Sequence, residues 1–111
     1  MKEKNIHALW FTEISFGGGH SLSIRLNLQN EGETVAGEVE FGEGKKYQLT
    51  GRLNHNVLTF LYYSPDNNRT SQGTGTFKLT GEGEILQGAF AYYSQERDLI
   101  DTLKCTFTVL K

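Results

Sequence analysis

The sequence predicts an all-β protein, an eight-stranded antiparallel up-and-down β-barrel. Three observations support this fold class. Apolar and polar residues alternate at period two along the whole chain, and no 3.6-residue period persists for three turns. Thirteen glycines stand against a single proline, which suits short strands joined by turns. The 111 residues are enough for one domain that buries roughly two thirds of its unfolded surface.

The alternation divides the chain into eight expected strands, at residues 6–16, 20–29, 34–41, 45–53, 57–64, 72–80, 84–93 and 99–110. The second is the clearest, because all four apolar residues from Leu22 to Leu28 share one face. The third and fourth place Val39 and Leu49 on similar faces, and the fifth is apolar on both faces. The residues that we expect inside the barrel are Ile24, Leu26, Val39, Leu49, Phe77 and Phe107.

Glycines recur at inward positions of these strands, as at Gly37, Gly51 and Gly75. Such glycines make room where a barrel wall curves or where neighbouring strands approach closely. A closed barrel also removes the exposed edges that a sandwich would leave. A two-sheet sandwich built from the same strands is the alternative architecture.

The connections between the expected strands are unequal. Those after even strands are tight turns, for example Asn54-His55-Asn56. Those after odd strands carry more varied residues than an ordinary hairpin turn. They lie at residues 17–20, 42–45, 64–71 and 94–98. In a meander all four of these loops share one rim, and both chain termini lie at the other rim. Binding residues concentrate on loops of a rigid scaffold, so the odd-loop rim is the candidate site.

A repeated phrase marks that rim: Tyr-Tyr-Ser followed by an arginine, once after the fifth strand and once after the seventh. Tyrosine rings stack on bases. The arginine guanidinium donates two parallel hydrogen bonds to phosphate oxygens, which a lysine ammonium cannot do. The pattern therefore predicts a flat, anionic ligand. The candidate ligand-binding residues are Tyr62, Tyr63, Ser64, Arg69, Thr70, Tyr92, Tyr93 and Arg97.

Plainer interpretations of the same residues stay open. The tyrosines are also expected of a barrel core whose hydroxyls reach water at the mouth. Each arginine is also expected of a solvated loop, paired with Asp66 or Asp98. The three histidines lie far apart, so no metal site is expected, and no nucleophilic triad is found. We therefore expect no enzyme activity and no cofactor.

Charge and cysteine content narrow the partners and the compartment. The net charge of -2 and the pI near 5.9 argue against a bulk nucleic-acid binder. The lone Cys105 is expected to be a buried thiol in a reducing compartment. No apolar stretch is long enough to span a bilayer, and no signal peptide precedes residue 6. We expect a cytoplasmic protein with a short segment, residues 1–5, before a barrel domain at 6–111.

The glycine and aromatic pattern resembles a known family. It comprises Trp10, Gly37-x-Val39-x-Phe41, Tyr47-x-Leu49-x-Gly51, Leu58-Thr59-Phe60-x-Tyr62, Gly73-x-Gly75-x-Phe77-x-Leu79 and Leu86-x-Gly88-x-Phe90. This run is similar to the β-barrel recognition domain of membrane-anchored effectors in bacterial CBASS anti-phage systems. The resemblance implies that the barrel binds a cyclic oligonucleotide and then assembles. It also implies transmembrane helices before residue 6, which the 111 residues do not include. If the native chain carries such helices, we expect an inner-membrane protein whose barrel faces the cytoplasm.

Three functions of different classes follow from these observations. The first is a sensor domain for a cyclic dinucleotide that oligomerises on binding its ligand. The second is an avidin- or lipocalin-like carrier of a small ligand, which the many large inward residues disfavour because they fill the barrel. The third is a non-enzymatic interaction barrel. Apolar strand faces with Leu58, Phe60 and Phe90 predict self-association in the first and third cases.

Overall fold

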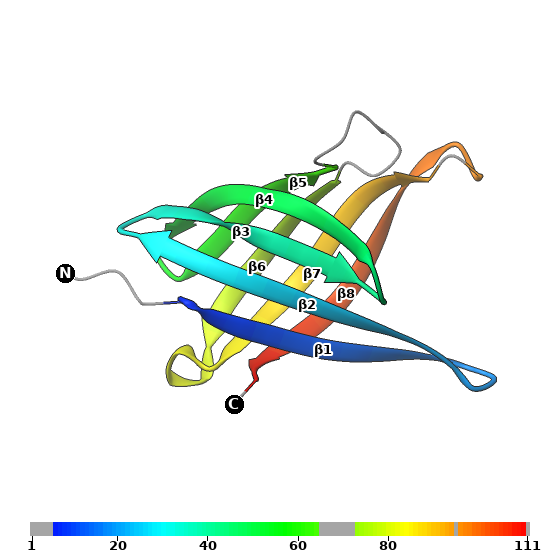
Figure 1. The fold of residues 1–111 in the computed structure, drawn as a ribbon, viewed down its shortest axis with the longest axis horizontal. Helices are drawn as coiled ribbons and strands as arrows, with labels where there is room; N and C mark the ends of the chain where they lie inside the picture. Colours follow the sequence, from blue (N-terminus) through cyan, green and yellow to red (C-terminus); the bar gives the residue numbers. More distant parts are fainter. Residues whose placement is uncertain (1–5, 65–72, 95, 111) are drawn as a thin grey trace.

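The computed structural model describes residues 6–64, 73–94 and 96–110 and shows one closed, all-antiparallel barrel (Figure 1). The strands run in up-and-down order, each pairing with the next and β8 pairing with β1. This confirms the predicted barrel over the sandwich. The strands are β1 (Ala8–Gly17), β2 (His20–Glu31), β3 (Thr34–Phe41), β4 (Lys45–Asn54), β5 (Val57–Tyr63), β6 (Gly73–Thr80), β7 (Ile85–Ser94) and β8 (Leu99–Val109).

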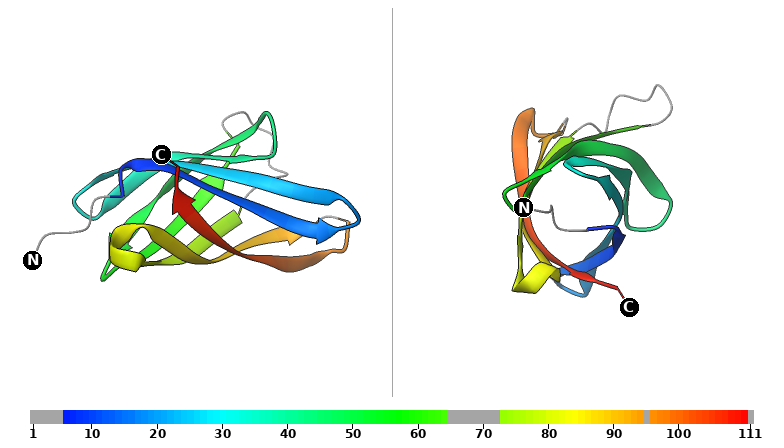
Figure 2. Two further views of the ribbon diagram at one scale, coloured as in Figure 1. Left: turned by 90° about the horizontal axis from the view of Figure 1, so that it is seen from below. Right: turned by 90° about the vertical axis from the view of Figure 1, so that its left-hand side faces the viewer.

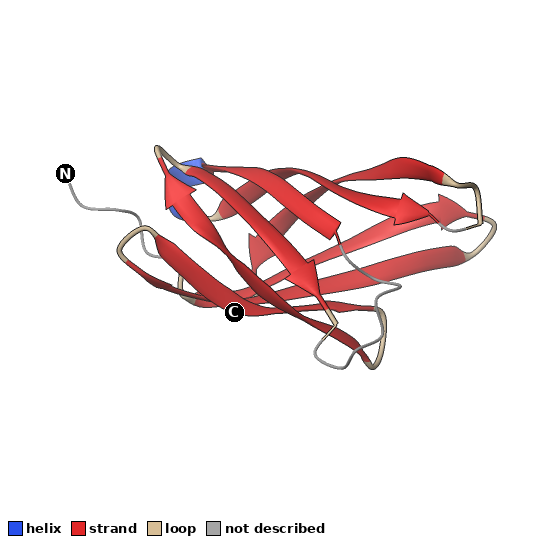
Figure 3. Cartoon of the chain, turned by 90° about the horizontal axis from the view of Figure 1, so that it is seen from above, coloured by secondary structure: helices blue, strands red, loops and turns tan. Residues whose placement is uncertain are grey.

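Strands make up most of the described chain (Figure 3). A single 3₁₀ turn, η2 (Gly81–Gly83), joins β6 to β7. Seen end-on, the strands form a ring (Figure 2, right). The predicted strand limits agree with the observed ones to within two residues, and those of β3 are identical. The differences fall at strand ends because hydrophobic periodicity specifies a strand's faces more firmly than its ends.

The barrel interior is filled by apolar side chains from every strand. All six residues predicted to lie inside are buried, with exposures of 2% or less: Ile24, Leu26, Val39, Leu49, Phe77 and Phe107. Phe90 is the centre of the aromatic core. Its ring centroid lies 5.2–6.0 Å from those of five other rings, which belong to Phe41, Phe60, Tyr62, Phe77 and Phe107. The described residues therefore form a packed interior core.

Three inward glycines allow neighbouring strands to approach closely. A Cβ added at Gly37, Gly51 or Gly88 would overlap a backbone carbonyl of the adjacent strand. At Gly88 the overlap is with the Thr76 carbonyl oxygen. The expected use of inward glycines in a curved wall is confirmed at these positions.

One end of the barrel is closed by the segment that precedes β1. Ile6 is fully buried there, and its carbonyl oxygen accepts a 3.1 Å hydrogen bond from the Trp10 indole nitrogen. The Ile6 amide donates to the Asn30 side-chain oxygen at 3.0 Å. The C-terminal end of β8 joins the same region, since the Leu110 amide donates to the Leu9 carbonyl. Both described chain ends therefore lie at the rim opposite the odd-numbered connections, as predicted.

The junction of β1 with β8 is short. Two residue pairs join these strands, Trp10 with Val109 and Phe11 with Thr108, and both are near the closed end. Beyond them the β1–β2 and β7–β8 hairpins diverge (Figure 1). Residues 12–17 of β1 and 99–107 of β8 thus pair on one side only within the described chain, and we call this split the seam.

Hydrogen exchange should detect the seam. We expect amides of residues 12–17 and 99–107 that face it to exchange at least about tenfold faster than those of β3 and β4, because unpaired or edge amides open at low free energy. Residue-resolved exchange measured by NMR checks this, with β3 and β4 as the internal reference, since each pairs on both sides. Equal protection across all strands would show instead that β1 and β8 pair along their full length in solution.

The predicted self-association surface requires a correction. Leu58, Phe60 and Phe90 are core residues, with exposures of 0%, 5% and 1%. Strands with two apolar faces do not reveal locally which face is inside, and barrel closure turned these three side chains inward. The exposed apolar residues of β5 are Val57 and Leu61. Self-association itself stays a prediction.

Candidate functional site

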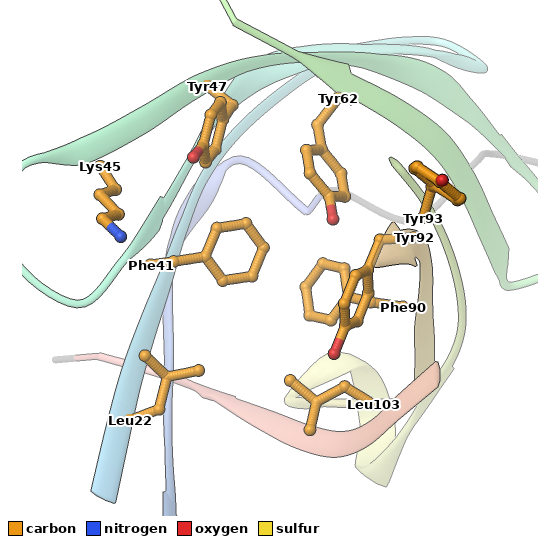
Figure 4. Close-up of a pocket in the computed structure, with 9 residues that line it drawn as sticks. All are labelled: Leu22, Phe41, Lys45, Tyr47, Tyr62, Phe90, Tyr92, Tyr93 and Leu103. Carbon is orange, nitrogen blue, oxygen red and sulfur yellow. The ribbon is translucent and has the colours of Figure 1, made fainter. Parts of the chain in front are cut away.

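The rim at the ends of the odd-numbered strands contains a cavity of about 250 Å³, which we call the mouth cavity (Figure 4). Its walls come from β2, β3, β4, β5, β7 and β8. The lining residues are Leu22, Phe41, Lys45, Tyr47, Tyr62, Phe90, Tyr92, Tyr93 and Leu103. The volume is slightly below the range of about 300–1,000 Å³ typical of pockets for drug-sized ligands. It suits one ring system.

Aromatic rings form most of the cavity surface. Phe41 packs against Tyr47 and Tyr62 with ring centroids 5.8 and 5.4 Å apart, and the two tyrosines lie 5.7 Å from each other. Phe90 forms the floor, 5.3 Å from Phe41 in an edge-on arrangement. The cavity therefore continues the aromatic core outward, and its floor is held rigidly by that core.

Glycine explains how the Tyr62 ring fits into this wall. Tyr62 pairs across the sheet with Gly73, which in turn pairs with Tyr92. A Cβ on Gly73 would overlap the hydroxyl of Tyr62, so the ring lies directly over the glycine. The sequence spacing thus places the Tyr62 and Tyr92 rings on the inner face, with no side chain between them.

The tyrosine hydroxyls converge on the mouth (Figure 4). Burial raises the pKa of Tyr62 well above that of a free phenol, and the proximity of Tyr47 and Tyr92 raises it further. Among the described residues, none hydrogen-bonds the hydroxyls of these three tyrosines. The Tyr62 hydroxyl therefore stays protonated at neutral pH, and all three hydroxyls are available to a ligand.

Lys45 is the charged residue among the described lining residues. It begins β4 and shares the inward face of Tyr47 and Leu49, because alternate residues of a strand point the same way. It stands opposite Phe41 in the strand pairing. The place of Lys45 in this lining was not among the predictions, although its spacing of two residues from the inward Tyr47 indicated it.

The predicted site residues divide into three groups. Tyr62, Tyr92 and Tyr93 line the mouth cavity. Tyr63 is on the outer face of β5, and Ser64 is half-buried directly after that strand. Arg69 and Thr70 lie outside the described residues. Both Tyr-Tyr-Ser copies are at the same rim, as predicted, and each pair of tyrosines is split between the inner and outer faces, as strand alternation requires.

Arg97 and Tyr93 make contacts within their own hairpin. The Arg97 guanidinium donates to the Asp101 carboxylate at 2.7 Å, and the Tyr93 hydroxyl donates to Asp98 at 2.6 Å. The expected arginine–carboxylate pairing is present, with Asp101 as the partner in place of Asp98. The Arg97–Asp101 ion pair is solvent-exposed, so it contributes at most about 1 kcal/mol to the stability of the fold and breaks easily.

A second hollow, which we call the outer groove, crosses the outside of β5 to β8 with a volume of about 590 Å³. Leu61, Tyr93 and Ile100 border it, and their side chains are 48%, 48% and 67% exposed. Tyr63 also borders this groove. Three of the exposed large apolar side chains of the described residues therefore lie together beside the mouth rim.

Other chemistry receives little support from the described residues. They contain no group of three or more metal-ligating side chains. Cys105 is buried, as predicted, and burial raises the pKa of its thiol to about 12, so it stays protonated and unreactive near neutral pH. In the described chain we find no helix with the length and apolar character needed to cross a bilayer.

Comparisons of the chain with protein-family models, curated proteins and solved structures find no match. The resemblance to CBASS recognition domains therefore stays a prediction, and the function is argued from the mouth cavity.

Proposed function

We propose that this protein is a non-enzymatic binding module that holds a small, ring-bearing ligand in the mouth cavity. The observation that supports this is a cavity walled by phenylalanine and tyrosine rings, with three tyrosine hydroxyls that lack partners in the described chain. Apolar walls with a few converging polar groups are typical of small-molecule sites. The aromatic rings supply contact area, and the hydroxyls orient the ligand.

The packed interior favours the mouth over the barrel centre as the ligand's location. Phe90 closes the floor and is itself packed against Phe77 and Phe107. A lipocalin-like ligand held deep inside would have to displace this core. The carrier function is therefore proposed here in a modified form, with one ring inserted into the mouth and the rest of the ligand at the rim.

A cyclic-oligonucleotide sensor is the second candidate function. The adjacent Tyr92 and Tyr93, together with the Lys45 ammonium, offer stacking surfaces and a cation at one rim. The cavity holds a single base, so the sugar–phosphate ring would lie over the rim near the exposed Arg97. Calorimetric titration with cyclic dinucleotides and trinucleotides separates the candidates, since a sensor binds them more tightly than it binds the isolated bases.

Replacing Tyr92 with alanine should weaken ring binding by about tenfold or more. Loss of one stacking surface costs about 1–3 kcal/mol in base-binding proteins. Ligand-observed NMR with a panel of indole, naphthyl and purine compounds first identifies a ring that binds. Its affinity for Tyr92→Ala is then measured by calorimetry.

Tyr63→Ala is the matched control, because it removes the same side chain from the outer face of a neighbouring odd-numbered strand. It should bind the selected compound as the unmodified protein does. Equal losses in the two variants would argue against the mouth as the site. The absence of binding by any ring compound to the folded protein would contradict the proposed function.

A further inference from the structure

The polar lining of the mouth cavity consists of hydrogen-bond donors and one positive charge. Each phenol can donate its proton, and the Lys45 ammonium carries three donors. No carboxylate belongs to the described lining residues. An apolar cup with this polar edge is electrostatically suited to a negative group on the ligand.

The acidic residues of the surrounding rim have other roles or face elsewhere. Asp101 accepts from Arg97, and Asp98 accepts from Tyr93. Glu40 accepts a hydrogen bond from the Gly44 amide in the β3–β4 turn, where the exposed Glu43 also lies. In the described chain Lys45 forms no ion pair with any of these carboxylates. Its ammonium is therefore available at the cavity edge.

The position of Lys45 on the inner face distinguishes it from an ordinary surface lysine. Its neighbour Lys46 points outward and stands opposite Glu40 on β3. Lys46 and Arg25 line the same shallow hollow on the outer face. Lys45 instead stands opposite Phe41, whose ring packs against Tyr62 within the cavity wall. Lys45 and Lys46 therefore carry the same charge on opposite faces of β4.

Given the ring-binding function proposed above, we infer that the mouth selects an anion. The ligand class is a flat ring bearing a carboxylate or a phosphate. The ring occupies the aromatic cup, and the anionic group lies at the edge between Lys45 and the hydroxyls of Tyr47, Tyr62 and Tyr92. Charge-assisted hydrogen bonds at this edge supply the selectivity, because they are shorter and stronger than neutral ones.

A pair of compounds of nearly equal shape tests this directly. 2-Naphthoate carries the charge, and 2-naphthamide replaces it with a neutral amide of similar size. Calorimetric titration should show 2-naphthoate binding about tenfold more tightly, the lower range for a hydrogen bond to a charged group. Lys45→Gln should remove that preference by weakening 2-naphthoate and leaving 2-naphthamide unchanged.

Lys46→Gln is the control for net charge, since it makes the same substitution one residue away on the outer face. It should retain the preference for 2-naphthoate. Equal affinity for the two compounds, or equal effects of the two lysine variants, would overturn the anion inference while leaving ring binding intact. If neither naphthyl compound nor any other ring binds, both the inference and the proposed function fail.

A third compound distinguishes the two sources of the anion. If 2-naphthyl phosphate binds more tightly than 2-naphthoate and Lys45→Gln weakens its binding, the result supports a ligand of the nucleotide type. The reverse order, with the same loss, supports an aromatic acid. Both orders agree with an anionic ligand at Lys45, and thermal unfolding of each variant confirms that the barrel is folded.

Discussion

Phe90→Ala is expected to lower the free energy of unfolding by about 3–5 kcal/mol, the cost typical of removing a buried aromatic side chain. Phe90 is 1% exposed and contacts five other rings, so the core cannot collapse into the space that the substitution leaves. A typical domain is stable by only about 5–15 kcal/mol, so this loss is a large share of the total. Urea denaturation followed by fluorescence of the single tryptophan, the buried Trp10, measures the change.

Phe16→Ala provides the matched control. Phe16 is on β1 and is 59% exposed, so its truncation should change stability by no more than about 0.5 kcal/mol. If Phe90→Ala does not fold, Phe90→Leu serves in its place, because leucine keeps most of the side-chain volume. It should lower the free energy of unfolding by a smaller amount, again through lost core packing. Similar losses for Phe90 and Phe16 variants would contradict the core assigned here.

Gly88→Ala should destabilise the barrel by an amount near the upper end of the about 1–3 kcal/mol seen for overpacked cores. The added methyl group would overlap the carbonyl oxygen and Cα of residues on β6, at Thr76 and Phe77. A side chain can rotate away from such a contact, but a paired strand has to move as a whole. The expected loss is therefore larger than glycine's intrinsic flexibility alone would suggest.

Gln87→Ala tests whether the effect comes from this close approach. Gln87 is the neighbouring residue on β7, and its side chain points outward and is exposed. Its replacement should have little effect on the midpoint of urea denaturation. A Gly88→Ala variant as stable as Gln87→Ala would mean that β6 and β7 are not packed as closely as the structure shows.

The candidate site was partly predictable from the sequence. Period two places Tyr62 and Tyr92 on the same face as Phe60 and Phe90, and meander order brings the ends of β5 and β7 to one rim. Both inferences are local, because alternation and strand order require no knowledge of distant contacts. The same alternation predicts that the two tyrosines of each pair face opposite sides, and Tyr63 does point outward.

The sequence pattern specified neither the place of Lys45 in the mouth cavity nor the partner of Arg97. Lys45 belongs to the cavity because β4 curves toward β5 and β3 there, which places its inward face beside Tyr47 and Phe41. Arg97 is held by Asp101, a residue four positions away that follows a turn whose geometry the sequence did not specify. The position of a residue on the inner face is therefore a better guide to whether it lines the cavity than the residue type alone.

The sequence by itself determined the all-β class, the eight strands, their order and the faces of strands with one apolar side, because period-two alternation is a local property of the chain. The tertiary structure decided which apolar face of β5 is inside, where the seam between β1 and β8 opens, and how the mouth cavity is shaped. These features depend on how strongly the sheet coils before it closes. That coiling depends on contacts between residues far apart in the sequence, such as the packing around Phe90 and the close approach of β6 to β7 at Gly88.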